Sequence, residues 1–169
     1  RRVRLWFSGD IGRERLPLLQ DPVLPEAAEY LIMESTYGDK HHSDPGLAYT
    51  ELKQIVGQTI RRGGKVIVPA FAVGRTQELV YMLNEMIAEN ELPELPVFVD
   101  SPLAVNASQI FSRHTYLFDA ETRAFVEEHR HPALNFKGLT YVQSVSESKE
   151  INERRGPLVI ISASGMAET

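Results

Sequence analysis

The chain has 169 residues, of which 43% are hydrophobic and 24% are charged, so it can bury the core of one ordinary domain, with or without an appendage. Its net charge of −5 argues against a protein that coats polyanions non-specifically, because such proteins are usually basic. The absence of cysteine excludes disulfides and thiolate metal sites and leads us to expect a cytoplasmic protein, and no apolar stretch approaches the length of a membrane span.

The first third of the chain predicts two short strands and one long helix. The strands are expected over residues 3–7 and 30–33, and the Pro-rich, charged segment 13–29 between them reads as a loop. Asp44 and Pro45 predict the start of the helix, because aspartate caps a helix N-terminus and proline fits its first turn. The apolar stripe of this helix and the glycines that end it are Leu52, Ile55, Val56, Ile60 and Gly63-Gly64.

The rest of the chain alternates strands with helices. Strands are expected over residues 65–71, 96–99, 139–143 and 158–162. Helices are expected over about 75–90, after the caps Ser101 and Asp119, and from a capping box at Ser144 and Glu147 to about residue 155. Such alternation gives right-handed crossovers, and it predicts a three-layer parallel α/β domain.

Small and polar residues follow the strands at four junctions, which are residues 34–38, 71–78, 100–104 and 162–166. Open α/β sheets bind ligands at the carboxyl ends of their strands. A helix N-terminus placed there offers free N–H groups and a partial positive charge, which favour an anion. These junctions therefore predict a site for an anionic substrate such as a phosphate.

Each candidate site residue has a functional interpretation and a simpler structural one. Asp10 either binds a metal or makes an Asx-turn, and Glu34 is a general base, the group that orients a catalytic histidine, or half of a salt bridge. Arg75 and Thr76 open a helix after a glycine, where a guanidinium and backbone N–H groups suit a phosphate, although Arg75 is equally explained as a solvated first-turn residue. The Ser164-Gly165 turn either caps a helix or brings N–H groups to a phosphate.

Five motifs in a fixed order carry a resemblance that spans almost the whole chain. They are residues 7–13 (FSGDIGR), 34–42 (ESTYGDKHH), 69–78 (PAFAVGRTQE), 100–104 (DSPLA) and 164–166 (SGM). Together they resemble the β-CASP family of metallo-β-lactamase-fold nucleases. The resemblance implies that residues 1–38 are a short segment of the αββα lactamase-like domain and that residues 39–169 are an incomplete β-CASP domain, whose parallel sheet begins near Lys65.

The same resemblance implies a function and a role for each matching residue. Members of the family cut RNA phosphodiester bonds with two zinc ions held between the two domains. Asp10 matches the carboxylate that bridges both ions, and Glu34 matches the acid that orients a histidine acting as general acid. Arg75 and the Ser164-Gly165 turn match positions that face the RNA cleft. Single-stranded RNA is therefore the expected partner.

Several histidine motifs of the family do not occur between Arg1 and Thr169, among them HxHxDH. We expect them in segments outside this sequence, so the chain reads as an inactive fragment of a zinc-dependent ribonuclease, whose partners include the rest of the lactamase-like domain and, in the intact parent, a second copy. A different interpretation is a free-standing α/β module that binds a nucleotide or a small anion. An HxHxDH motif upstream in the reading frame would favour the nuclease, and its absence the module.

Overall fold

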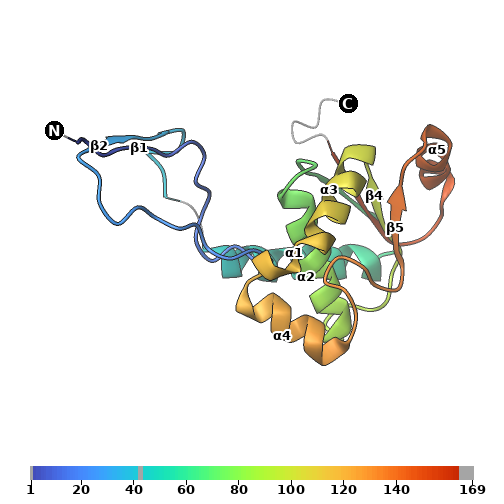
Figure 1. The fold of residues 1–169 in the computed structure, drawn as a ribbon. Helices are drawn as coiled ribbons and strands as arrows, with labels where there is room; N and C mark the ends of the chain where they lie inside the picture. The colour runs from blue at the N-terminus through green and yellow to red at the C-terminus, as the bar shows by residue number, and fades with distance from the viewer. Residues whose placement is uncertain (1, 42–43, 164–169) are drawn as a thin grey trace.

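The computed structural model describes residues 2–41 and 44–163, and it contains two separate parallel sheets. A two-stranded sheet pairs β1 (Leu5–Phe7) with β2 (Tyr30–Ile32). The four-stranded sheet has the order β3-β6-β4-β5. In Figure 1 the two-stranded sheet stands apart from the helical body that holds the other sheet. None of the helices in the described part of the chain has the length and apolar character to span a membrane.

The elements of the body confirm the expected α/β class. Its strands are β3 (Lys65–Pro69), β4 (Val97–Asp100), β5 (Leu139–Val142) and β6 (Leu158–Ser162). Its helices are α1 (Pro45–Arg61), α2 (Arg75–Ala88), α3 (Pro102–Arg113), α4 (Ala120–His129) and α5 (Val145–Glu153), with a short 3₁₀ turn η1 (Thr115–Leu117). The sheet of the body begins at Lys65, as the sequence predicts. Helix α2 ends earlier than expected because Asn90, just beyond its C-cap, adopts a left-handed φ of +58°.

Side-chain caps start four helices at the expected positions. Asp44, Ser101, Asp119 and Ser144 accept hydrogen bonds from the amides of Gly46, Ala104, Thr122 and Glu147, respectively. The carboxylate of Glu147 also accepts from the Ser144 amide at 3.0 Å, which completes the capping box. Local sequence therefore decides where these helices begin.

The order of the strands places helices on both faces of the sheet. The chain runs from β3 to β4 and on to β5, and then returns to lay β6 between β3 and β4. Crossovers between parallel strands are right-handed. Because the chain moves across the sheet in the opposite direction between β5 and β6, α5 lies on the face opposite α2 and α3. The packing agrees: Val97 and Val99 of β4 join the main core, whereas Phe98 packs with Ile151 of α5. The three-layer arrangement follows from this reversal.

Part of the 13–29 segment is anchored to the body, although it forms the expected loop. Leu18 is fully buried in the main core. Leu19 bridges Phe118 in antiparallel fashion, and the Gln20 amide donates to the Leu117 carbonyl at 3.0 Å. These contacts tie the chain that leaves β1 to the junction between η1 and α4.

The two-stranded sheet is rich in apolar residues, as buried sheets are, but its faces are not covered. Parallel sheets are normally covered on both faces, and two isolated strands are marginally stable in water. Here the apolar side chains of both strands are largely exposed, among them Leu5, Phe7, Tyr30, Leu31 and Ile32. Among the described residues, no segment covers these side chains enough to bury them.

Candidate functional site

Three of the four junctions meet at one edge of the four-stranded sheet. Ser162 at the end of β6 lies between Pro69 of β3 and Asp100 of β4 in the strand register. The Ala70 amide donates to the Ser162 carbonyl at 2.9 Å, which holds the residue after β3 against the end of β6. The turn Ser164-Gly165 lies outside the described residues. The carboxyl edge thus gathers the loop before α2 and the start of α3.

Two fully buried polar side chains, Thr76 and Gln77, hold the loop between β3 and α2 in place. Thr76 donates to the Phe71 carbonyl twice, from Oγ1 at 2.8 Å and from its amide at 3.3 Å. Gln77 Oε1 accepts from the Gly74 amide at 2.7 Å, and its Nε2 donates to the Ala72 carbonyl at 3.1 Å. Buried polar groups satisfied in this way hold a loop in one conformation.

Gln77 also joins this loop to α3, a role that the sequence analysis missed. Its Nε2 donates to Ser108 Oγ at 2.9 Å and to the Ala104 carbonyl at 3.3 Å. The available signal was a glutamine at the third position of a helix whose cap, Gly74, has no side chain to accept hydrogen bonds. Gly74 has a φ of +84°, which glycine adopts without strain.

Arg75 points its guanidinium at Glu78, one turn further along α2. Arg75 Nη1 and Glu78 Oε2 are 2.7 Å apart, and the side chains are 50% and 13% exposed, respectively. Burial raises the pKa of Glu78, while the positive charges of Arg75 and Arg13 act to lower it. Arg13 lies three residues beyond Asp10, so the segment that follows β1 comes close enough to α2 for its charge to affect Glu78.

The amides at the start of α2 already have protein partners. The Gly74 amide donates to Gln77 Oε1, the Arg75 amide to the Val73 carbonyl at 3.2 Å, and the Thr76 amide to Phe71. The sequence predicted that free N–H groups and the Arg75 guanidinium would face the same point. These amides are not free, so that prediction does not hold for them. An anion at this junction would be held by the half-exposed Arg75 side chain, and Thr76 would act through the loop that it fixes.

Asp10 and Glu34 follow the paired strands β1 and β2, at the same end of the two-stranded sheet. The Ser8 amide donates to the Ile32 carbonyl at 2.9 Å, and the Glu34 amide donates to Ser8 Oγ at 3.3 Å, so the two strand ends stay adjacent. Hydrogen bonds from the Thr36 side chain and amide lower the pKa of Glu34, which keeps this carboxylate ionised. Asp10 is exposed in a loop between Gly9 and Gly12, which both have positive φ.

The described residues contain no group of three or more His, Cys, Asp or Glu side chains that could hold a metal ion. A catalytic zinc ion takes three protein ligands. An exposed carboxylate at a strand end, such as Asp10, fits one position of such a ligand set. The described residues therefore fit a contribution to a metal centre, and the remaining ligands would have to come from elsewhere.

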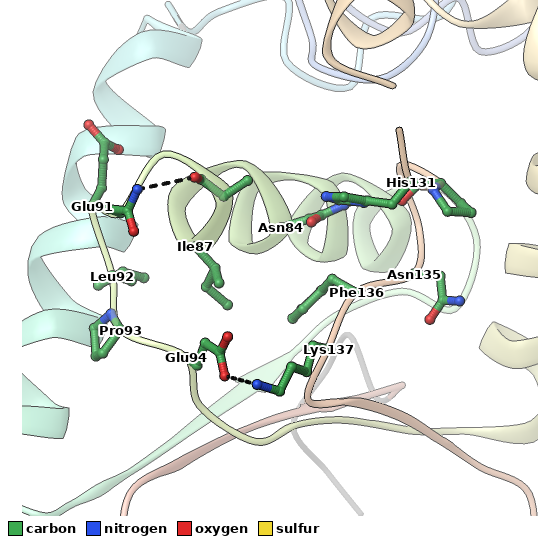
Figure 2. Close-up of a pocket in the computed structure, with 13 residues that line it drawn as sticks. Asn84, Ile87, Glu91, Leu92, Pro93, Glu94, His131, Asn135, Phe136 and Lys137 are labelled. Carbon is green, nitrogen blue, oxygen red and sulfur yellow. Dashed lines mark hydrogen bonds and ion pairs between the residues drawn. The ribbon is translucent and has the colours of Figure 1, made fainter. Parts of the chain in front are cut away.

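A cavity of about 870 Å³ lies at the opposite edge of the sheet, beside the loops that precede β4 and β5 (Figure 2). Asn84 Nδ2 donates to the Pro132 and Ala133 carbonyls at 3.2 and 2.8 Å, which fastens the second loop to α2. Glu94 and Lys137 form an ion pair of 2.7 Å between the two loops. Because the cavity is lined by none of the candidate site residues, it does not belong to the site at the carboxyl edge.

Residues 76–169 match the Beta-Casp domain family, which covers more than half of the chain. The chain belongs to the β-CASP family. The motif-based prediction of the family and of its α/β fold is thereby confirmed. Within the helical body, the match includes Thr76, Gln77 and Glu78 of α2 and all of α3, α4 and α5.

Individual relatives extend the similarity over nearly the whole chain. It is 35% identical over 162 residues to Ribonuclease TTHA0252 of Thermus thermophilus, 34% over 165 to Transcription termination factor FttA of Methanosarcina mazei, and 28% over 173 to Endoribonuclease YSH1 of Candida glabrata. These alignments cover 96%, 95% and 98% of this chain, but only 37%, 25% and 22% of the relatives. The chain therefore spans well under half the length of these relatives.

Proposed function

We propose that this chain is part of a longer zinc-dependent ribonuclease that hydrolyses phosphodiester bonds of single-stranded RNA. The observation that carries the proposal is the alignment of 96–98% of the chain with proteins named ribonuclease and endoribonuclease. This alignment includes both Asp10 and Glu34, which lie together at one end of a parallel sheet. In this proposal the chain alone does not cleave RNA, because further metal ligands come from other segments of the longer protein.

In this proposal Asp10 would be the ligand shared by two zinc ions, which when bound supply an activated water and stabilise charge on the reacting phosphate. Glu34 would accept a hydrogen bond from a histidine of another segment and hold that ring in one orientation. Its lowered pKa suits this role, since an ionised carboxylate is the stronger acceptor. Glu34 is thus a positioning residue.

Arg75 would contact an RNA phosphate at the carboxyl edge of the four-stranded sheet. A guanidinium and a phosphate make a strong charge-assisted contact. The salt bridge to Glu78 leaves the other guanidinium nitrogens of this half-exposed side chain available to RNA. Thr76 would act indirectly by fixing the loop. Ser164 and Gly165 stay candidates for further phosphate contacts.

The exposed β1–β2 sheet gives the missing remainder of the protein a place to dock. We assign residues 1–38 to a lactamase-like domain that other segments complete and residues 39–169 to the β-CASP domain. Covering both faces of the small sheet would bury its apolar side chains and bring further metal ligands to Asp10. A homodimer of the full-length protein and a cytoplasmic location complete the proposal.

The decisive experiment compares the full-length protein with the 169-residue chain. Both are incubated with end-labelled single-stranded RNA, with and without a zinc chelator, and their zinc content is measured. The proposal expects chelator-sensitive cleavage and two zinc ions per full-length protein, and neither for the chain. Cleavage by the purified chain would overturn its assignment as an inactive part. A full-length protein that binds nucleotides without cleaving RNA would instead be a binding module.

A further inference from the structure

We propose that Phe71 is a stacking platform for one base of the bound RNA, beside the phosphate contact made by Arg75. Phe71 directly follows β3 and Ala70 at the carboxyl edge of the sheet, and its side chain is 64% exposed. The inference rests on the proposed function, since it assigns a contact to the RNA that the nuclease would cut. It adds a recognition element for the base to a site that so far holds groups only for the phosphate and the metal.

The backbone of Phe71 is held unusually firmly for a residue with such an exposed side chain. Its carbonyl accepts both hydrogen bonds of the fully buried Thr76, at 2.8 and 3.3 Å. One residue earlier, the Ala70 amide donates to Ser162 of the adjacent strand. An exposed ring on a fixed backbone can bind a flat partner with little further loss of conformational freedom.

The loop after Phe71 is held just as firmly. The Gln77 side chain hydrogen-bonds to the Ala72 carbonyl and the Gly74 amide, so this part of the loop is tied to α2. Among the residues of this loop, Phe71 and Val73 have largely exposed side chains. The buried network thus presents a large flat apolar ring to solvent at the edge where α/β sheets bind their ligands.

The chemistry of this surface matches that of a nucleotide. Single-stranded RNA offers an apolar base with a π-face and an anionic phosphate, and proteins bind it with aromatic rings and basic side chains together. Phe71 and Arg75 flank one loop, and the Thr76 amide that follows Arg75 donates to the Phe71 carbonyl. The ring and the guanidinium therefore come from the two ends of one short loop whose backbone is fixed.

The test measures the affinity of the full-length protein for a short non-cleavable RNA and for the same backbone with abasic residues. The variants are Phe71→Ala, Phe71→Trp and a matched control, Tyr116→Ala. Tyr116 has an aromatic side chain that is 65% exposed, but it lies in η1 beyond the C-terminal end of α3, at the opposite edge of the sheet. Melting temperatures are recorded for all of them.

Phe71→Ala is expected to weaken binding of the intact RNA by about 5- to 150-fold, the range for loss of one stacked base. It should leave the weaker binding of the abasic strand unchanged. Phe71→Trp should retain the affinity for intact RNA, and Tyr116→Ala should bind both strands like the wild type. Only a contact to a base produces this difference between the strands.

Two outcomes overturn the proposal. Equal weakening on both strands, with a lowered melting temperature that Phe71→Trp does not restore, means that Phe71 packs against another part of the protein. An unchanged affinity in Phe71→Ala means that the ring contacts no base. Failure of the proposed function itself looks different, because the wild type would then bind neither strand measurably.

Discussion

Arg75 is oriented by one carboxylate, and that pairing bears on the proposed phosphate contact. Its salt bridge to Glu78 spans 2.7 Å, and Glu78 is the more buried partner. Removing Arg75 would leave that acid without its nearest positive charge, so the pKa of Glu78 should rise further above its ordinary value. The pair therefore links the predicted phosphate contact to the protonation state of a partly buried acid.

We predict that Arg75→Ala in the full-length protein weakens RNA binding by about ten- to a hundredfold, because a charge-assisted contact is worth roughly 1.5–3 kcal/mol. The salt dependence of binding should also become shallower, as one phosphate fewer is neutralised. Titration of a non-cleavable RNA at two salt concentrations measures both effects. Arg61→Ala, at the far end of α1, is the control that should bind normally. Unchanged affinity together with a lower melting temperature would make Arg75 a structural residue.

Asp10 and Glu34 should separate metal binding from catalysis. Asp10→Ala is expected to abolish cleavage and reduce bound zinc, since a ligand shared by two cations is lost. Glu34→Gln keeps the shape of the side chain but removes its charge, so cleavage should slow while the zinc content stays the same. Metal analysis and cleavage assays on the same preparations test both. Two full zinc ions in the Asp10→Ala protein would refute the role given to Asp10.

At the scale of elements, Gln77 holds α2, α3 and the loop that carries Phe71 in one arrangement. Gln77→Leu preserves size but leaves the Gly74 amide and the Ala72 carbonyl without their partner. Buried groups left unpaired cost about 1–3 kcal/mol each, so we predict a loss of roughly 2–6 kcal/mol in the free energy of unfolding. Denaturant melts measure it, with Gln54→Leu on the exposed face of α1 as the matched control. An equal effect of both substitutions would argue against the network.

The C-terminal half of α2 carries an acid in an unfavourable position. Burial raises the pKa of Glu85, and the negative charges of Glu89 and Glu91 raise it further. A carboxyl group whose pKa is higher in the folded state than in the unfolded state destabilises the fold when it is ionised. Its cost is absent below the unfolded pKa, sets in as the pH rises through the window up to the folded pKa, and is complete above that window.

Glu85→Gln is therefore predicted to raise stability at neutral pH, and the gain should shrink as the pH falls toward 4.5, the ordinary value for glutamate. Denaturant midpoints measured from pH 7 downward provide the test. Glu147→Gln is the contrasting variant, because hydrogen bonds from the Gln143 and Ser144 amides and from the Ser144 hydroxyl lower the pKa of that carboxylate, and its ionised form favours the fold. A constant gain at every pH would show that Glu85 acts through packing.

At the scale of the whole molecule, the two sheets differ in how much protein surrounds them. The four-stranded sheet has helices on both faces, whereas the side chains of the two-stranded sheet are largely exposed. We predict that, in the 169-residue chain, the amides of β1 and β2 exchange with solvent much faster than those of β4 and β6. In the full-length protein the difference in exchange rate between the two sheets should be smaller. Equal protection in both forms would mean that the small sheet needs no further cover.

Sequence alone determined the features that depend on a few neighbouring residues. The helix starts at Asp44, Ser101, Asp119 and Ser144 were predictable because a capping side chain and the amide it satisfies lie within three positions of each other. The central strands β4 and β6 were predictable because continuous apolar runs are typical of strands covered on both faces, but the run at β3 did not predict that Ile67 would be 67% exposed on this edge strand. The family was predictable because its motifs recur in order along the chain, and the match over residues 76–169 confirmed it.

Tertiary structure decided what depends on residues far apart in the chain. The insertion of β6 between β3 and β4 brings Ser162 between Pro69 and Asp100, and no local pattern specifies that order. The burial of Thr76 and Gln77 likewise requires α3 and the strand ends to be in place, and it turned an expected set of free amides into a fixed loop. Hydrogen bonds between distant segments form only when the chain has folded, so the sequence marked the edge where a ligand would bind, and the packing beneath that edge determined which groups stay available to it.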